Sequence, residues 1–569
     1  MKPISCLVAL ALVAVSGCGS GSNSNVNTIQ QPQIIVTIIP SKATTPVGTF
    51  QPFTASVYGP SSGVKWTASA GTIDQSGNYT APLTVPAGGT AKITATTTTS
   101  PAVSGSAIVT ITTQPVTLTI TPSAATVKAG FYQTYTAVIR GTTNVNATWS
   151  VTDFPGDVTF PGFINGGIFN APAPVLTPDT FLISAISSAD PSKTASATVS
   201  VIPLENQVEQ SFPIKLGTSG INAAVGTCCT GTLGSLLVDQ KGKQYILSNN
   251  HVIGRVGHAK PGEAILQPGY VDTLCDSSLP NTVANFTFAA PLLTSNVDAA
   301  IAQVVPGAVD TQGDIIGLGG TASDGSYISA PPANTTVAPI VGMPVAKSGR
   351  TTGLSCGSVL GISARVCVDY PPDCGNTIAM TVCFSGQVIM GSLAQPGDSG
   401  SLIVDADTAQ PIGLLAAASA DGRFTIANPV TDILSALKTG TGSTFKFVGA
   451  GQHRASCILA PPISGEELIA TSTVISSQDI GHALDVQKRY ERTIMQDAAV
   501  IGTAVGMSDV SPGRASLLIF LERGKFPGQL PTSLEGVDVR VIQTGRFQAR
   551  IRPSNPNRFK CSRASVSPR

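Results

Sequence analysis

The pattern of apolar and polar residues predicts a chain built mainly from β-strands. Residues 107–112 (Ala-Ile-Val-Thr-Ile-Thr) and 119–122 (Thr-Ile-Thr-Pro) alternate apolar with hydroxylated side chains, the pattern of a strand with one buried face. Apolar runs that we interpret as strands also precede His251, begin after Asp298 and follow Ser399. We therefore expect a multidomain, mainly β protein.

The segment from about residue 33 to residue 203 contains the same pattern twice. The matching positions are Pro40 and Pro122, Gly48 and Gly130, and Trp66 and Trp149. Short strands, turn signals and one tryptophan per unit predict two β-sandwiches of the usual ~100-residue size. They resemble the immunoglobulin-like modules of bacterial surface proteins, with boundaries at 33–114 and 115–203. Because neither unit shows a charged or aromatic patch, we interpret the pair as a stalk.

Ser399 lies in the stretch that most suggests chemistry, Pro-Gly-Asp-Ser-Gly-Ser at 396–401. A serine hydroxyl is a weak nucleophile, so it needs an adjacent base and a site that stabilises an oxyanion. The flanking glycines permit a sharp turn, although the same composition occurs in ordinary turns. A functional role is favoured because His251 ends one apolar strand and Asp298 opens another, at 299–302. His, Asp, Ser is the chain order of the chymotrypsin triad.

These motifs resemble those of the trypsin/chymotrypsin-like serine peptidases, which fold as a double β-barrel. They are Asn-Asn-His-Val at 249–252, Val-Asp-Ala-Ala-Ile at 297–301 and Pro-Gly-Asp-Ser-Gly-Ser at 396–401. Residues 231–234 and 347–353 are similar to a divergent bacterial and plant branch of the family. The resemblance covers about residues 214–438, within a domain that we place at 204–440.

The resemblance implies a role for each residue. His251 would be the general base, Asp298 would orient its imidazole, and Ser399 would be the nucleophile. The backbone N–H groups of Gly397 and Ser399 would form the oxyanion hole. The reaction would need no metal and no cofactor, and the partner would be a protein or peptide substrate.

The resemblance also implies a substrate pocket. Leu393, six residues before Ser399, would lie at its base, and the wall would be formed by Ala416, Ala417 and Ala418. Such a pocket gives an arginine or lysine side chain no charge partner. We therefore expect cleavage after small or medium apolar residues.

Other residues compete weakly for these roles. Asp310 and Asp314 are alternatives to Asp298, but neither is followed at once by an apolar strand. His258 stands after a glycine in a loop and is interpreted as a surface residue.

The sequence permits two routes to an ordered oxyanion loop. In the digestive enzymes a new N-terminus inserts beside the aspartate that corresponds to Asp398. Here no activation site is evident before Ile214. Either internal contacts hold the loop, or the enzyme requires processing.

The N-terminus is typical of an exported lipoprotein. Lys2 precedes an apolar run at 7–15, which is too short to span a bilayer as a stable helix. Val-Ser-Gly-Cys at 15–18 looks like a bacterial lipobox, which implies removal of residues 1–17 and acylation of Cys18. Residues 18–32 would form a flexible tether. The alternative is an ordinary secretory signal in which Cys18 is incidental.

Composition agrees with an extracytoplasmic location. The 569 residues include 58 Gly, 41 Pro and only 11% charged residues, which indicates a loop-rich and strand-rich chain. Lys and Arg number 33 against 32 Asp and Glu, so no net field favours nucleic acid. We expect the bacterial cell envelope, with lipid anchoring at the outer membrane or cell surface.

The 11 cysteines also favour an oxidising compartment. Cys6 would be lost with the signal and Cys18 would carry lipid, so an odd number remains and at least one should be free or intermolecular. We expect Cys228 or Cys229 to pair with Cys275, Cys367 with Cys374, Cys356 with Cys383, and Cys457 with Cys561.

Residues 441–569 have a different pattern, which predicts a small α+β accessory domain. Residues 477–494 predict a helix, because Ile480 and Leu484 begin an approximately helical apolar spacing and Ser477 can cap it. Strands are predicted at 500–506, 515–521 and 534–542, with a turn at 511–513 between the first two. Residues 546–569 carry seven basic residues and no acidic one, and we interpret them as a solvated tail rather than a binding arm.

The sequence thus predicts a lipid-anchored, extracytoplasmic serine endopeptidase. The competing hypothesis is a surface binding or adhesion lipoprotein whose peptidase domain is inactive. The presence of all three triad candidates argues against that loss.

Overall fold

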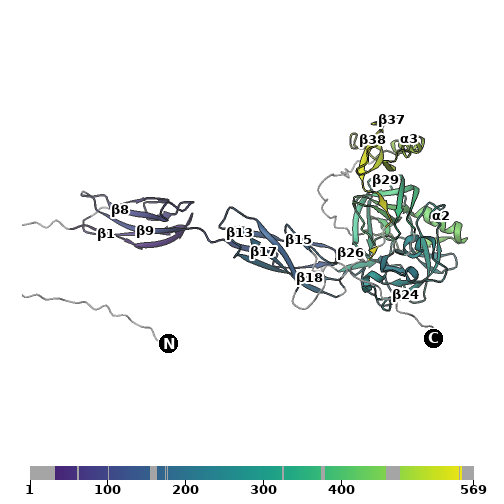
Figure 1. Cartoon of the computed structure of the whole chain (residues 1–569), viewed down its shortest axis with the longest axis horizontal. Coiled ribbons are helices and arrows are strands. Elements are labelled where there is room, and N and C mark those ends of the chain that lie inside the picture. Colours follow the sequence, from purple (N-terminus) through teal and green to yellow (C-terminus); the bar gives the residue numbers. More distant parts are fainter. Residues whose placement is uncertain are drawn as a thin grey trace, which may run out of the picture. The chain divides into compact units, whose positions relative to one another are not determined.

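The chain is mainly β in the computed structural model (Figure 1). The structure describes residues 33–60, 63–99, 101–153, 163–172, 175, 177–322, 326–372, 374, 378–455, 475–549 and 552–553. The predicted signal, tether and Cys18 lie outside these ranges. Two compact units result, one formed mainly by residues up to 118 and the other mainly by later ones. Within the described ranges, no helix combines the length and apolarity that crossing a membrane requires.

The first module has one apolar core, between small sheets. The sheets are β2 (Lys42–Pro46), β9 (Ser104–Thr112), β8 (Thr90–Thr97) and β5 (Val64–Ala68); β3 (Phe50–Pro52), β7 (Asn78–Thr80) and β6 (Thr72–Ile73); and β1 (Ile35–Ile39) with β4 (Thr54–Tyr58). Trp66 is buried in this core with Phe53 and Tyr79. Gly77 adopts φ +86°, and a Cβ there would lie 3.2 Å from the Trp66 ring, so a glycine lets the hairpin close over the tryptophan.

The second module has the same order of strands. Its sheets are β11 (Ala124–Lys128), β18 (Thr194–Ile202), β17 (Asp179–Ser187) and β14 (Ala147–Asp153); β12 (Tyr132–Thr134), β16 (Ile168–Asn170) and β15 (Phe163–Asn165); and β10 (Thr117–Thr121) with β13 (Thr136–Arg140). The pairs β2–β9 and β11–β18 are both parallel. Gly167 also has φ +86°, and its Cβ would lie 3.2 Å from Trp149. The predicted repeat is therefore a repeated fold.

The next sheet surrounds a large apolar core and carries the histidine and aspartate candidates. Its strands, in order, are β34 (Phe445–Phe447), β21 (Ser235–Asp239), β22 (Gln244–Ser248), β25 (Ala300–Val304), β24 (Asn281–Ala289), β23 (Ala264–Gln267), β19 (Thr218–Asn222), β20 (Cys229–Leu233) and β40 (Arg552–Pro553). The short helix α1 (Asn250–Ile253) follows β22. Helix α2 (Val430–Thr441) packs its buried Ile433 and Leu437 against this core.

The last large sheet begins as a closed barrel. Its strands are β28 (Pro344–Gly349), β31 (Leu402–Asp405), β32 (Pro411–Ser419), β33 (Thr425–Pro429), β30 (Met380–Met390) and β29 (Gly353–Tyr370), and a further pairing of β28 with β29 closes the ring. A separate two-stranded sheet is formed by β26 (Ile315–Thr321) and β27 (Tyr327–Ala330). Ser399 lies in the loop that enters β31.

The described strands after residue 440 join the two large sheets. The strands β35 (Val500–Met507), β36 (Ala515–Glu522), β38 (Val537–Thr544) and β37 (Ser533–Leu534) extend the barrel sheet outward from β29. β34 joins the other sheet instead. The long strand β29 connects this extension to the barrel, because it pairs with β30 on one side and with β35 on the other.

Two local predictions in this region need correction. Helix α3 (Ser477–Ile494) forms as predicted, but its N-cap is Ser476, whose hydroxyl accepts from the N–H of Asp479. The predicted strand 534–542 is a hairpin, because Glu535 and Gly536 have φ +48° and +79°, the backbone of a tight primed turn. The pattern of apolar residues alone did not predict this turn.

Three disulfides join residues that lie 16 to 145 positions apart in the sequence. Cys228 pairs with Cys275, as one of the predicted alternatives, and Cys229 pairs with Cys374. Cys367 pairs with Cys383, not with Cys374, because the two face each other across β29 and β30. Cys356 is also disulfide-bonded, and with Cys383 already taken the predicted 356–383 bridge is wrong. The predicted bridge between Cys457 and Cys561 lies outside the described residues.

Candidate active site

His251 and Asp298 are brought together by neighbouring strands. β22 ends at Ser248 and β25 begins at Ala300, and these residues face each other in an antiparallel ladder. Nδ1 of His251 lies 2.5 Å from Oδ2 of Asp298, and the His251 backbone N–H donates to Oδ1 at 3.1 Å. The two side chains are 2% and 0% exposed. The carboxylate thus holds both the ring and the backbone of the histidine.

Further donors fix Asp298 in place. Tyr370, on β29, donates its hydroxyl to Oδ2 at 2.9 Å. The Asp298 carbonyl accepts from the Asn249 side chain at 2.7 Å, and its N–H donates to Asn428 at 2.9 Å. Burial, and then the adjacent Asp298 carboxylate, raises the pKa of Tyr370 well above its usual value. The phenol therefore remains a neutral donor throughout the neutral range.

The competing residues lie elsewhere. Asp314 forms an ion pair with Lys215 at 3.5 Å, and Asp310 accepts from the backbone N–H of Gln312 at 2.9 Å. His258 is exposed, as expected for a surface residue.

The Ser399 loop packs against the strands that lead to His251. The N–H of Thr232 on β20 donates to the Ser399 carbonyl at 2.9 Å, and the Ser248 hydroxyl donates to the Thr232 carbonyl at 2.7 Å. Gly400 has φ +96°, and a Cβ there would lie 2.4 Å from the Ser248 hydroxyl oxygen. Only glycine permits so close an approach. The Ser399 loop therefore packs against Ser248, which precedes His251 by three residues.

The second ring nitrogen of His251 is available for proton transfer. Nε2 is buried and has no hydrogen-bond partner within the part of the chain that the structure describes. A buried polar nitrogen without a partner is costly and calls for a functional explanation. Ser399, whose side chain is 3% exposed, is the serine that the sequence pattern assigns to this nitrogen.

Internal contacts hold the loop in front of Ser399. The Asp398 carboxylate lies 3.2 Å from the ammonium of Lys347, and both side chains are fully buried. The carboxylate also accepts from the backbone N–H groups of Thr351, Thr352 and Gln395 at 2.8, 3.1 and 2.9 Å. Burial lowers the pKa of Lys347, and the neighbouring Asp398 opposes that shift. The loop before Ser399 is thus held by an internal ion pair and by backbone hydrogen bonds.

Gly397 completes the turn before the serine. Its φ is +101°, a backbone conformation that glycine adopts without strain. Its carbonyl accepts from the Thr232 hydroxyl at 2.9 Å. The hydrogen bond to the Gly397 carbonyl therefore holds the turn, and the positive φ of this glycine sets the path of the backbone.

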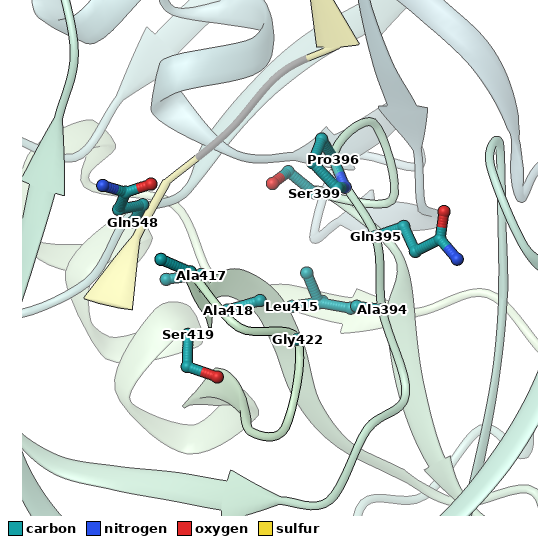
Figure 2. Close-up of a pocket in the computed structure, with 11 residues that line it drawn as sticks. Ala394, Gln395, Pro396, Ser399, Leu415, Ala417, Ala418, Ser419, Gly422 and Gln548 are labelled. Atoms are coloured by element: carbon teal, nitrogen blue, oxygen red, sulfur yellow. The ribbon is translucent and has the colours of Figure 1, made fainter. Parts of the chain in front are cut away.

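An apolar pocket of about 100 Å³ opens beside Ser399 (Figure 2). Alanines from two segments dominate its lining, which comprises Ala394, Gln395, Pro396, Ser399, Leu415, Ala417, Ala418, Ser419, Ala420, Gly422 and Gln548. No charged side chain belongs to this set. Leu393 and Ala416 do not belong to it either: both are buried, and Leu393 packs in a neighbouring apolar cluster.

Sequence reasoning missed three residues of this site. Lys347 stands in the 347–353 stretch that resembles a branch of the peptidase family, so a signal for it existed. Tyr370 and Gln548 carried none, because their positions depend on how β29 and the C-terminal segment pair with other strands.

Tyr370→Phe should lower kcat/KM about tenfold, since a hydrogen bond to a charged group contributes roughly 1.5–3 kcal/mol. The Asp298 carboxylate, having lost a donor, should attract the imidazolium proton more strongly. The acid limb of the pH–rate profile should therefore move to higher pH. The profile of kcat/KM against pH measures this. Tyr245→Phe, which removes another buried tyrosine–aspartate contact at 3.3 Å, is the control and should leave that limb unmoved. An unchanged limb in Tyr370→Phe would refute the role.

Comparisons with known proteins give limited guidance. No protein-family model and no curated protein matches the chain. Among solved structures, a Nocardiopsis protease is 15% identical and covers 41% of this chain and 98% of its own, with a TM-score of 0.28. Thermobifida fusca protease A is 16% identical with the same coverage of both chains and a TM-score of 0.27. Three repeats of mouse cadherin-23 are 11% identical and cover 30% of this chain and 65% of theirs, with a TM-score of 0.18. Likeness at this level leaves the functional inference to the geometry of the site.

Proposed function

We propose that the chain is a serine endopeptidase that hydrolyses peptide bonds through an acyl-enzyme on Ser399. His251 Nε2 takes the proton of the Ser399 hydroxyl as the oxygen attacks the substrate carbonyl carbon. The N–H groups of Gly397 and Ser399 stabilise the resulting oxyanion. His251 then protonates the departing amine, and a water molecule, deprotonated by the same nitrogen, releases the acid product. Asp298 keeps the Nδ1 proton in place throughout.

The observation that carries this proposal is the buried His251–Asp298 pair, whose Nε2 is left without a partner among the described residues. A decayed site would have no reason to retain such a nitrogen, which argues against an inactive adhesion protein. A fluorescent fluorophosphonate should label the protein at Ser399, and mass spectrometry of the tryptic peptide locates the adduct. Absence of labelling in a folded and unblocked enzyme would refute the proposal.

We propose cleavage after small or medium apolar residues. The support is the alanine-rich lining beside Ser399 and the absence of charge from it. An arginine or lysine placed there without a partner should be disfavoured by several kcal/mol, whereas one methylene should change the rate by roughly 10–200-fold. A peptide library digested by the enzyme tests this. A preference for arginine or lysine before the cut would contradict it.

We propose that acylated Cys18 anchors the mature chain in the cell envelope. The support is the lipobox-like stretch at 15–18 and the flexible residues after it. The native protein should partition into detergent, and the Cys18→Ser protein should not, because one or more acyl chains supply the membrane affinity. Phase separation of both proteins measures this. Equal partitioning of the exported forms would show that Cys18 is incidental.

A further inference from the structure

The short strand β39 (Phe547–Gln548) borders the pocket beside Ser399. It pairs antiparallel with the end of β32, with Gln548 opposite Ala418 and Phe547 opposite Ser419. Gln548 is one of the residues that line the pocket (Figure 2). Leu415, three residues before Ala418, accepts at its carbonyl from the N–H of Gly400 at 3.0 Å. Because the pairing is antiparallel, the chain beyond Gln548 runs toward the Ser399 end of β32.

The same segment reappears on the other side of Ser399. Arg552 and Pro553 form β40, which pairs antiparallel with β20, opposite Thr230 and Cys229. Thr232, two residues farther along β20, donates its N–H to the Ser399 carbonyl at 2.9 Å. The strands β20 and β32, which both form hydrogen bonds with the Ser399 loop, therefore each pair with one of these two short strands. Figure 2 shows β39 in yellow beside the labelled Gln548.

Strand addition of this kind is how an extended peptide binds to a protein. Backbone hydrogen bonds supply affinity, while pockets beside the strand select alternate side chains. Here the stretch is extended at both ends and pairs with a strand from each of the two sheets that bring the candidate active site together. The pairing of β39 with β32 is of this kind.

Contacts outside the pocket keep the stretch in place. Phe547 is fully buried and packs edge-on against Phe520, with ring centroids 5.9 Å apart. Nε of Arg546 lies 2.8 Å from the Asp369 carboxylate, and the Ala549 N–H donates to the Asp369 carbonyl at 3.0 Å. A ligand held on the same chain acts at a high effective concentration, on the order of millimolar for a short flexible tether.

The neighbouring pocket loop is held as well. Asp421 accepts from the N–H of Gly545 at 3.1 Å and from Arg523 at 2.8 Å. The Ala420 N–H donates to the Arg546 carbonyl at 2.9 Å. Residues from beyond the barrel therefore hold the turn at 420–422 beside the pocket and supply the strand at the edge of the pocket.

We propose that the segment from Phe547 to Ala549 is the chain's own peptide ligand and acts as a tethered competitive inhibitor of the site. The inference rests on the proposed peptidase function of Ser399. Substrate gains the edge of β32 only when this stretch leaves it. The enzyme is thus restrained by its C-terminal segment, while the Lys347–Asp398 pair already orders the loop before the serine.

Two truncations test the proposal. A chain that stops after Gly545 lacks the stretch, and it should hydrolyse a small apolar peptide substrate with kcat/KM at least tenfold above that of the full chain. A synthetic peptide with the sequence 544–556 should inhibit this truncated enzyme competitively. The matched control stops after Pro553, which removes only residues 554–569 and should leave the rate unchanged.

A reversible lock covers the case in which removal of Phe547 prevents folding. Residues opposite each other in an antiparallel pair have Cα atoms about 4.5–5.5 Å apart, within the range of a disulfide. The double variant Ala418→Cys with Gln548→Cys should therefore form a bridge that keeps β39 in the pocket. Oxidation should reduce its turnover at least tenfold and mild reduction should restore it, with the wild-type chain unaffected by the same treatment.

Fluorophosphonate labelling separates the two levels of inference. If Ser399 is labelled but the folded truncated and full chains have equal kcat/KM, or the oxidised and reduced double variant do, the inhibitor proposal is overturned and the peptidase stands. If no form is labelled, although the shorter chain is folded, the peptidase proposal fails and the inhibitor proposal fails with it.

Discussion

Ser399→Ala should lower kcat by roughly 10⁴–10⁶-fold, because only binding and oxyanion stabilisation then remain. The Ser399 carbonyl accepts a hydrogen bond from the N–H of Thr232, and the backbone of Gly400 packs so close to Ser248 that a Cβ would not fit. An alanine at position 399 preserves these backbone contacts. The variant should therefore fold normally and bind substrate with little change, so the loss should appear in kcat. Initial rates with an apolar peptide substrate measure it.

Ser392→Ala is the matched control for this substitution. Ser392 is an exposed serine upstream in the same loop region, and its variant should retain full activity and full labelling by the fluorophosphonate. His251→Ala should lose about as much activity as Ser399→Ala, because residues that act as a unit are strongly non-additive. A Ser399→Ala protein that keeps more than a few per cent of wild-type kcat would exclude the acyl-enzyme mechanism.

Lys347→Met should destabilise the protein by about 3–5 kcal/mol, since it leaves the fully buried Asp398 carboxylate without its ionic partner. The loop between Asp398 and Gly400 should then lose its fixed geometry, and with it the N–H groups at Gly397 and Ser399. Loss of an oxyanion donor costs roughly 10²–10³-fold in kcat. Urea unfolding measures the first effect and steady-state kinetics the second.

The double variant Lys347→Met with Asp398→Asn distinguishes the ion pair from side-chain packing. The amide no longer carries a buried charge, so the double variant should recover a large part of the lost stability, and the coupling between the two sites should be strong. Lys215→Met removes an ion pair in which Lys215 is 44% exposed and should cost less than about 1 kcal/mol. If Lys347→Met is no more destabilising than Lys215→Met, Lys347 does not hold the loop.

The sequence predicted those features whose pattern lies within one short stretch of the chain. Helix α3 was predicted with its observed bounds, because its apolar residues recur within the same eighteen positions. His251 and Asp298 were singled out by their place beside apolar strands, and the structure joins them at 2.5 Å. The repeat of the N-terminal modules was visible because proline, glycine and tryptophan recur at matching positions in both units.

The sequence did not predict which distant segments pair with each other. Cys367 could equally reach a near neighbour or a strand partner, and the register of β29 with β30 chose Cys383. The two-residue turn at 535–536 was hidden because the apolar alternation continues on both sides of it. The pairing of β35 with β29 could not be predicted either, because it joins segments more than 130 residues apart.

The sequence by itself determined which residue types stand at the candidate site and which strands carry them, since motif and periodicity are properties of adjacent residues. Only the tertiary structure decided what surrounds those residues: Tyr370 on Asp298, Lys347 beneath Asp398, and Gln548 at the pocket edge. The physical reason is that each of these contacts joins segments many residues apart. Their positions depend on strand register and on the burial that the whole fold creates, and neither quantity is encoded in any single stretch of the chain.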